Sequence, residues 1–197
     1  MKGERPGALR GAMGLFAVIV ALQAIDVVLG TSFFWSHDLR HHHLPWRSWA
    51  ASQWGAGSLP LWATQVGMGF PLMADGQIGV FYPVNVLLGQ IFSAARALSL
   101  GLLLHQWWAA LGTWWLCRTL GRSDLASRLA GVGFALSGFY VSHFTYAGLQ
   151  HVAAWIPWGM CALLQLREER RFRWWWLWAL SVAAMLTAGH PQMAVIG

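Results

Sequence analysis

Five long apolar runs alternate with shorter polar connections along the chain. They cover residues 12–29, 97–116, 125–145, 149–166 and 174–197, the last including the start of a further segment. A helix needs roughly 20 predominantly apolar residues to cross the hydrocarbon layer of a bilayer. Such a segment must satisfy its own backbone hydrogen bonds, as a helix does. The pattern predicts an all-α fold in one domain, a polytopic transmembrane bundle of about five spans.

Composition agrees with this prediction. The chain is 57% hydrophobic and 10% charged, with a mean hydropathy of +0.47, whereas soluble domains carry about 25% charged residues. The net charge of +6 is typical of contact with anionic lipid headgroups. No segment is typical of a nucleic-acid-binding module, so nucleic acid is excluded as a predicted partner.

The basic residues indicate an orientation, because Lys and Arg concentrate in cytoplasmic loops. They lie before the first run (Lys2, Arg5 and Arg10), around the second connection within 118–128, and between the last two runs within 167–173. We therefore expect residues 1–11 in the cytoplasm and the long loop 30–92 outside the membrane.

Two features give local structure to the connections. In the loop, Trp46, Trp49 and Trp54 have the spacing of a short interfacial helix within 45–55, since Trp prefers the headgroup layer. The glycines of 67–79 predict tight turns, and 83–92 predicts another short helix. Farther on, Ser123 is placed to cap the third helix, and Pro157 lies inside the fourth.

The loop also carries the chemistry. Asp38 stands close in sequence to Arg40, His42, His43 and Arg47, so a carboxylate able to accept a proton adjoins cations able to hold phosphate. One hypothesis makes Asp38 a general base and these neighbours phosphate ligands. The alternative is structural: Asp38 caps the loop helix and pairs with Arg40 or Arg47.

Polar residues elsewhere extend this set. Asp75 and Gln77 lie in the glycine-rich turn, where they suit hydrogen bonds to sugar hydroxyls, although Asp is also common in turns for local backbone reasons. His37 and His41 have the i, i+4 spacing of a metal-binding pair. No second ligand pair follows at a zinc-like spacing, so no cofactor is predicted and a divalent metal stays a minor alternative.

A family resemblance covers nearly the whole chain. The segments that carry it are Asp38-Leu39, Gly57-x-Leu59-Pro60-Leu61-Trp62, Gly69-Phe70-Pro71-Leu72, Gln77-x-Gly79-Val80-Phe81-Tyr82-Pro83-x-Asn85, Phe134-Ala135-Leu136-Ser137-Gly138-Phe139, Trp155-Ile156-Pro157-Trp158 and Ala188-Gly189-His190-Pro191-Gln192. In this order they resemble the opening of the YfhO family of bacterial multi-pass membrane proteins. Because family members are longer, we expect the chain to be the amino-terminal part of a larger protein.

The resemblance implies a GT-C type glycosyltransferase of the bacterial cytoplasmic membrane. Such enzymes move a sugar from a polyprenyl-phosphate donor to a cell-envelope acceptor outside the membrane, and they keep an essential acid in the first loop, where Asp38 lies. Tyr82, His190 and Gln192, from the family segments, complete the expected substrate-binding residues. Membrane lipid is the further expected partner.

Two alternatives remain open from the sequence. The first is a transporter or flippase for a lipid-linked or cell-envelope precursor, which would carry polar groups along its helices and breaks near the membrane midplane. The second is an inactive fragment of the enzyme that contributes only its loop. The outward bias of the polar residues favours the enzyme.

Overall fold

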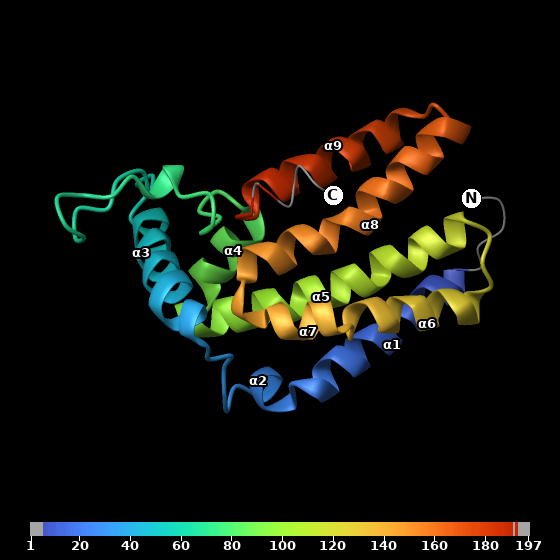
Figure 1. Ribbon diagram of the computed structural model, residues 1–197, viewed down its shortest axis with the longest axis horizontal. Coiled ribbons are helices and arrows are strands. Elements are labelled where there is room, and N and C mark those ends of the chain that lie inside the picture. Colours follow the sequence, from blue (N-terminus) through green and yellow to red (C-terminus); the bar gives the residue numbers. More distant parts are fainter. Residues whose placement is uncertain (1–5, 191, 193–197) are drawn as a thin grey trace.

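The computed structural model describes residues 6–190 and 192, and helices make up most of them (Figure 1). The helices are α1 (Pro6–Gln23), α2 (Ile25–Leu29), the π-helical turn η1 (Leu39–His43), α3 (Leu44–Gly55), the 3-10 turn η2 (Leu72–Ala74), α4 (Pro83–Ile91), α5 (Ala94–Thr119), α6 (Asp124–Ala135), α7 (Gly138–Ser142), the 3-10 turn η3 (His143–Thr145), α8 (Ala147–Glu168) and α9 (Phe172–Thr187). The predicted all-α class is confirmed for these residues.

Helix α5 is the centre of the bundle. It packs most extensively against α8 and α6, and α1 covers a further side of it. Helix α9 folds back along α8 as an antiparallel hairpin, while α3 lies across the other end of the bundle beside α4 (Figure 1). The segment between α3 and α4 thus projects beyond the end of α5.

Buried aromatic side chains hold α5 and α8 together. The indole rings of Trp108 and Trp158 stack with their centroids 4.1 Å apart, and the Trp158 N–H donates to the Trp108 carbonyl at 3.1 Å. Trp114 and Phe16 are almost fully buried in the same cluster. Burying an aromatic side chain of this size is among the largest single contributions to a core, so this layer fixes how the two helices meet.

Polar side chains inside the bundle tie three helices together. Gln106 on α5 is fully buried; it accepts a hydrogen bond from Gln23 of α1. Its own amide donates to the Ala135 carbonyl at the end of α6 at 2.9 Å. A buried amide is stable only when its donors and acceptors are paired, so Gln106 joins α1, α5 and α6 specifically.

The predicted polytopic transmembrane bundle is wrong. Within residues 6–190 and 192, no helix combines the length and the apolar character that crossing a membrane requires. The expected span 125–145 divides into α6, α7 and η3, because α6 ends at Ala135 and Ser137 caps a new helix. At about 1.5 Å per residue, the 12 residues of α6 fall well short of a hydrocarbon core roughly 30 Å thick.

The other four expected spans fail for similar reasons. Helix α1 ends at Gln23, and α9 has only 16 residues. Helices α5 and α8 are long enough, but they carry polar residues in their interiors, including His105, Gln106 and His151. Residues 1–5 of the predicted cytoplasmic segment 1–11, with Lys2 and Arg5, lie outside the described residues, as do residues 191 and 193–197 of the fifth expected span.

The long loop contains the short helices expected from its sequence. Helix α3 carries the Trp residues of 45–55, and α4 starts at Pro83. Between them the backbone turns repeatedly, and Gly67, Gly69 and Gly79 have positive φ angles. Ala63 and Phe70 form an isolated antiparallel bridge that closes the segment into a small lobe.

Candidate functional site

A π-helical turn sets the buried face of α3. The Leu44 N–H donates to the carbonyl of Leu39, five residues earlier. Pro45 explains this wider turn, because its ring would collide with the carbonyl four residues before it in a regular α-helix. Within this turn Leu39 and His43 are buried. Arg47 lies one helical turn after His43. The local sequence thus aims two basic side chains into the protein.

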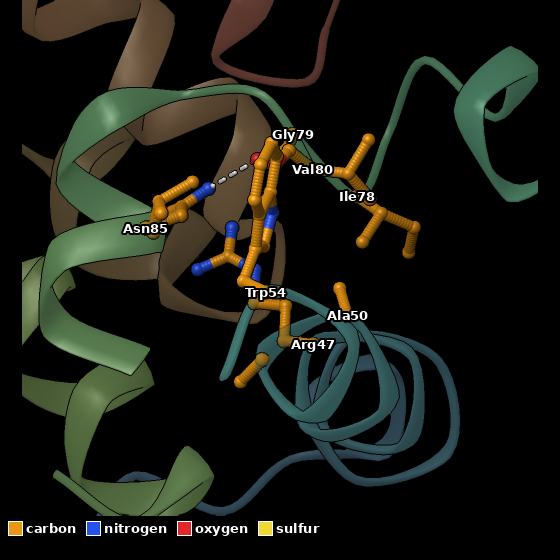
Figure 2. A pocket seen from close by; sticks show the side chains of 9 residues that line it. Arg47, Ala50, Trp54, Ile78, Gly79, Val80 and Asn85 are labelled. Carbon is orange, nitrogen blue, oxygen red and sulfur yellow. Dashed lines mark hydrogen bonds between the residues drawn. The ribbon is translucent and has the colours of Figure 1, made fainter. Parts of the chain in front are cut away.

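Arg47 lies in a small pocket between α3 and the segment that precedes α4. Its side chain extends toward Gly79 between Trp54 and Asn85 (Figure 2). Both neighbouring side chains are fixed by hydrogen bonds to backbone carbonyls: the Trp54 indole N–H donates to Val80 and the Asn85 side-chain amide donates to Gly79. The pocket has a free volume of about 20 Å³, which is room for one water-sized group.

The Arg47 guanidinium is poorly satisfied inside the protein. Its Nε and Nη2 atoms are buried and have no hydrogen-bond partner among the described residues. Burial lowers the pKa of Arg47 to about 10, with the nearby Tyr82 acting in the opposite direction. The group therefore stays cationic at neutral pH and presents unused donors to the pocket.

Tyr82 links this region to α5 and α8. Its hydroxyl lies 2.7 Å from His105 Nε2 and accepts a hydrogen bond from the Trp155 N–H at 2.8 Å. His105 Nδ1 lies 2.6 Å from the Gly101 carbonyl, which can only accept. Nδ1 therefore carries the proton, and in the neutral ring Nε2 accepts from the Tyr82 hydroxyl. Burial raises the pKa of Tyr82 to about 12 and lowers that of His105 to about 4.

His151 completes the group. Its ring stacks on His105 with centroids 3.8 Å apart and an interplanar angle of 20°. The residue is fully buried, yet neither ring nitrogen has a partner. Burial and the neighbouring His105 lower its pKa, and burial followed by Arg47 lowers that of His43. Both rings are therefore neutral at pH 7.

We call His43, Arg47, Tyr82, His105 and His151 the inner cluster. Among the described residues, no ion pair joins any of these five to a carboxylate. The nearest link runs through His42, whose Nε2 lies 3.9 Å from Asp75 Oδ2 and whose ring meets His43 edge to face. A buried cation with basic neighbours and no acid favours an anionic ligand.

The structure brings some of the predicted site residues to the inner cluster and leaves others outside. His43, Arg47 and Tyr82 belong to it, and His42 with Asp75 borders it. Arg40 is exposed, with its guanidinium carbon 5.2 Å from the centre of the Trp35 ring.

Asp38 lies at the start of the π-helical turn and is partly exposed. It precedes Arg47 by nine residues, about 13 Å along a helix axis at ~1.5 Å per residue. The structure contains neither of the structural contacts expected of it. Its side chain makes no cap hydrogen bond, and the described residues include no ion pair between Asp38 and either Arg40 or Arg47.

The remaining predicted residues gather near one backbone crossing. Asp75 Oδ1 accepts the Gln77 N–H at 2.9 Å, a local turn contact. The Gln77 backbone passes so close to Gly189 that a Cβ added to Gly189 would lie 2.5 Å from the Gln77 carbonyl oxygen. His190 is therefore close to Gln77, while Gln192 is exposed.

The sequence did not single out His105 or His151 as site residues. Their one sequence signal is a polar residue inside an apolar run. Their pairing depends on the crossing of α5 and α8, which no local pattern contains. For the metal alternative, no three His, Cys, Asp or Glu side chains of the described residues come together to hold an ion.

Comparisons with known proteins give this geometry no further context. No family model matches the chain, and neither a curated protein nor a solved structure matches it.

Proposed function

We propose that the protein is a glycosyltransferase that moves a sugar from a polyprenyl-phosphate donor to a cell-envelope acceptor. The donor phosphate binds at the inner cluster. The observation that carries this proposal is the buried guanidinium of Arg47, whose Nε and Nη2 lack partners among the described residues. The reaction class rests on the resemblance to the YfhO family.

The energetics of burial favour an anionic ligand at Arg47. Burying an ionised group is costly unless it is paired and hydrogen-bonded, and the described carboxylates leave Arg47 unpaired. Two adjacent guanidinium donors match two phosphate oxygens in a bidentate pair. Because the pocket itself admits only a water-sized group, one phosphate oxygen enters it and the rest of the donor lies at its mouth.

Residues of the loop can accept the proton and hold the negative charge that the transfer step produces. The bond from the sugar carbon to the phosphate oxygen breaks, and the same carbon bonds to the acceptor hydroxyl oxygen. The hydroxyl proton passes to the Asp38 carboxylate, and the negative charge on the departing phosphate is held by Arg47. Asp75 and Gln77 hydrogen-bond the sugar. Since Asp38 precedes Arg47 along one helix, the sugar occupies the space between base and phosphate site.

The test separates donor binding from transfer. Membranes containing the protein are incubated with labelled polyprenyl-phosphate sugars, and both bound donor and transferred label are measured. We expect Asp38→Asn to keep donor binding and lose transfer, whereas Arg47→Gln loses both. Arg171→Gln, which removes an exposed arginine paired with Glu169, is the matched control and should change neither.

Two results would contradict the proposal. Transfer at the wild-type level in both Asp38→Asn and Arg47→Gln would remove both residues from the reaction. Donor that is bound by the wild type but never consumed, across several sugars, would favour the transporter or flippase in place of the enzyme.

A further inference from the structure

His151 differs from the other histidines of the inner cluster in its unused bonding capacity. Both ring nitrogens of His105 are hydrogen-bonded, one to the Gly101 carbonyl and one to the Tyr82 hydroxyl. His43 has a buried unpartnered Nδ1, while His151 has both nitrogens buried and unpartnered. A neutral imidazole offers one donor and one acceptor, whereas a protonated one offers two donors. His151 therefore has the most to gain from an acceptor-only ligand.

Among the groups that act electrostatically on His151, only Arg47 is charged at neutral pH. The groups that act on it electrostatically are His105 on α5, Arg47 on α3 and His43 on the π-helical turn, and the Tyr82 ring lies 5.8 Å away. None of these is an acid. Without a bound anion, a second positive charge beside Arg47 is unfavourable in a buried setting, so the ring stays neutral.

We propose that the inner cluster takes up a proton from solvent when a doubly charged phosphate monoester, such as the departing polyprenyl phosphate, occupies it, and that His151 is the group that receives the proton. The inference rests on the proposed function, in that a phosphate occupies the site. The intact donor is a phosphodiester with one negative charge, whereas the polyprenyl phosphate that departs is a monoester with nearly two near pH 7, of which Arg47 balances one. A nearby negative charge favours the charged form of a histidine.

Linkage turns this into a measurable dependence. A site that takes up one proton per ligand binds about tenfold more tightly for each unit by which the pH falls, as long as the free site stays unprotonated. A phosphate monoester itself gains a proton near pH 6, which would confuse the result. Sulfate remains a dianion throughout the range from pH 8 to pH 6.5 and is therefore the probe.

The experiment is calorimetry of sulfate binding at pH 7 in buffers of different ionisation heat, at constant ionic strength held with chloride. The slope of observed heat against buffer heat gives the number of protons taken up, and we expect about one per sulfate. In one buffer series, the affinity should rise about tenfold from pH 8 to pH 7.

Variants identify the proton acceptor. His151→Gln keeps an amide able to donate, so sulfate should still bind, more weakly, with proton uptake near zero. His37→Gln removes an exposed histidine and should leave both values unchanged. Circular dichroism establishes that each variant is folded. If His151→Gln does not fold, the wild-type buffer series still measures whether a proton is taken up.

The possible failures are distinguishable. Sulfate bound by the wild type with no proton uptake refutes the inference and leaves the proposed function intact. Proton uptake that persists in folded His151→Gln assigns the proton elsewhere and also refutes it. No binding of sulfate or inorganic phosphate to the wild type overturns this inference together with the phosphate site of the proposed function.

Discussion

Mild acid should destabilise this protein through three buried histidines. His43, His105 and His151 all have pKa values lowered from 6.5 in the folded chain, chiefly by burial. In the unfolded chain each returns to about 6.5 and binds a proton as the pH falls below that value. The unfolded state then holds more protons, so the stability present above pH 6.5 is lost progressively toward the folded-state pKa, about 4 for His105.

The size of the loss follows from this linkage. One pH unit below an unfolded pKa of 6.5, each histidine that stays neutral in the folded state costs about 1.4 kcal/mol. The three together therefore lower the free energy of unfolding by about 4 kcal/mol between pH 7.5 and pH 5.5. That is a large part of the roughly 5–15 kcal/mol that stabilises a typical protein.

Urea unfolding followed by tryptophan fluorescence at pH 7.5 and pH 5.5 measures this loss. His151→Phe keeps a ring at the stack on His105 but cannot be protonated, so the pH-dependent loss should shrink by about 1.4 kcal/mol. His37→Gln should leave it unchanged. A wild-type difference below about 1 kcal/mol between the two pH values, or an equal loss in His151→Phe, would refute the reasoning.

Four further substitutions test close packing, a buried hydrogen bond and a helix cap, each by urea unfolding. Gly148→Ala should lower the free energy of unfolding by about 1–3 kcal/mol, because its Cβ would lie 2.4 Å from the Gly189 carbonyl oxygen; Gly133→Ala, in open space on α6, should raise it by about 0.5–1 kcal/mol. Equal effects would contradict the close approach. Tyr82→Phe leaves the Trp155 N–H without its acceptor and should cost about 1–3 kcal/mol; no loss would mean that this bond is dispensable. Ser123→Ala removes the cap bond from the Ala126 N–H and should cost about 1 kcal/mol, and an unchanged midpoint would argue against the cap.

Local features of the fold could be predicted from the sequence where one short-range rule decides. The Ser123 cap is confirmed, since its hydroxyl accepts the Ala126 N–H at 3.2 Å. The helix that contains Pro157 and the helix that begins at Pro83 are also present. Each depends on backbone geometry within a few residues, which the sequence contains directly.

The membrane spans could not be predicted correctly, because apolar composition does not determine where a helix ends. Residues 125–145 form one apolar run in the sequence. The boundary between α6 and α7 is nevertheless set by the Ser137 hydroxyl, which accepts a hydrogen bond from the Tyr140 N–H at 3.3 Å. A short polar residue inside an apolar run competes with the helix for backbone hydrogen bonds. Hydropathy averaged over a window misses that competition.

The candidate site divides in the same way. Arg47 and His43 could be singled out because they lie in one loop with an unusual density of polar residues, and Tyr82 because it lies in one of the segments that carry the family resemblance. His105 and His151 are more than 40 residues apart in sequence, and their stack exists only once α5 and α8 cross. Asp38 could be proposed from the sequence, but its distance from Arg47 along the helix could not.

The π-helical turn before α3 makes the loop sensitive to a change of one codon. Deleting a single residue from 39–43 would move everything before it by one helical position, a rotation of about 100° relative to Arg47, while Pro45 would still exclude the carbonyl four residues before it. Asp38 would then face a different direction while every downstream contact stayed in place. An insertion or deletion at this point would therefore alter the relation between the acid and the phosphate site without changing either residue. Related chains with and without this extra residue would therefore differ in the direction in which Asp38 points relative to Arg47.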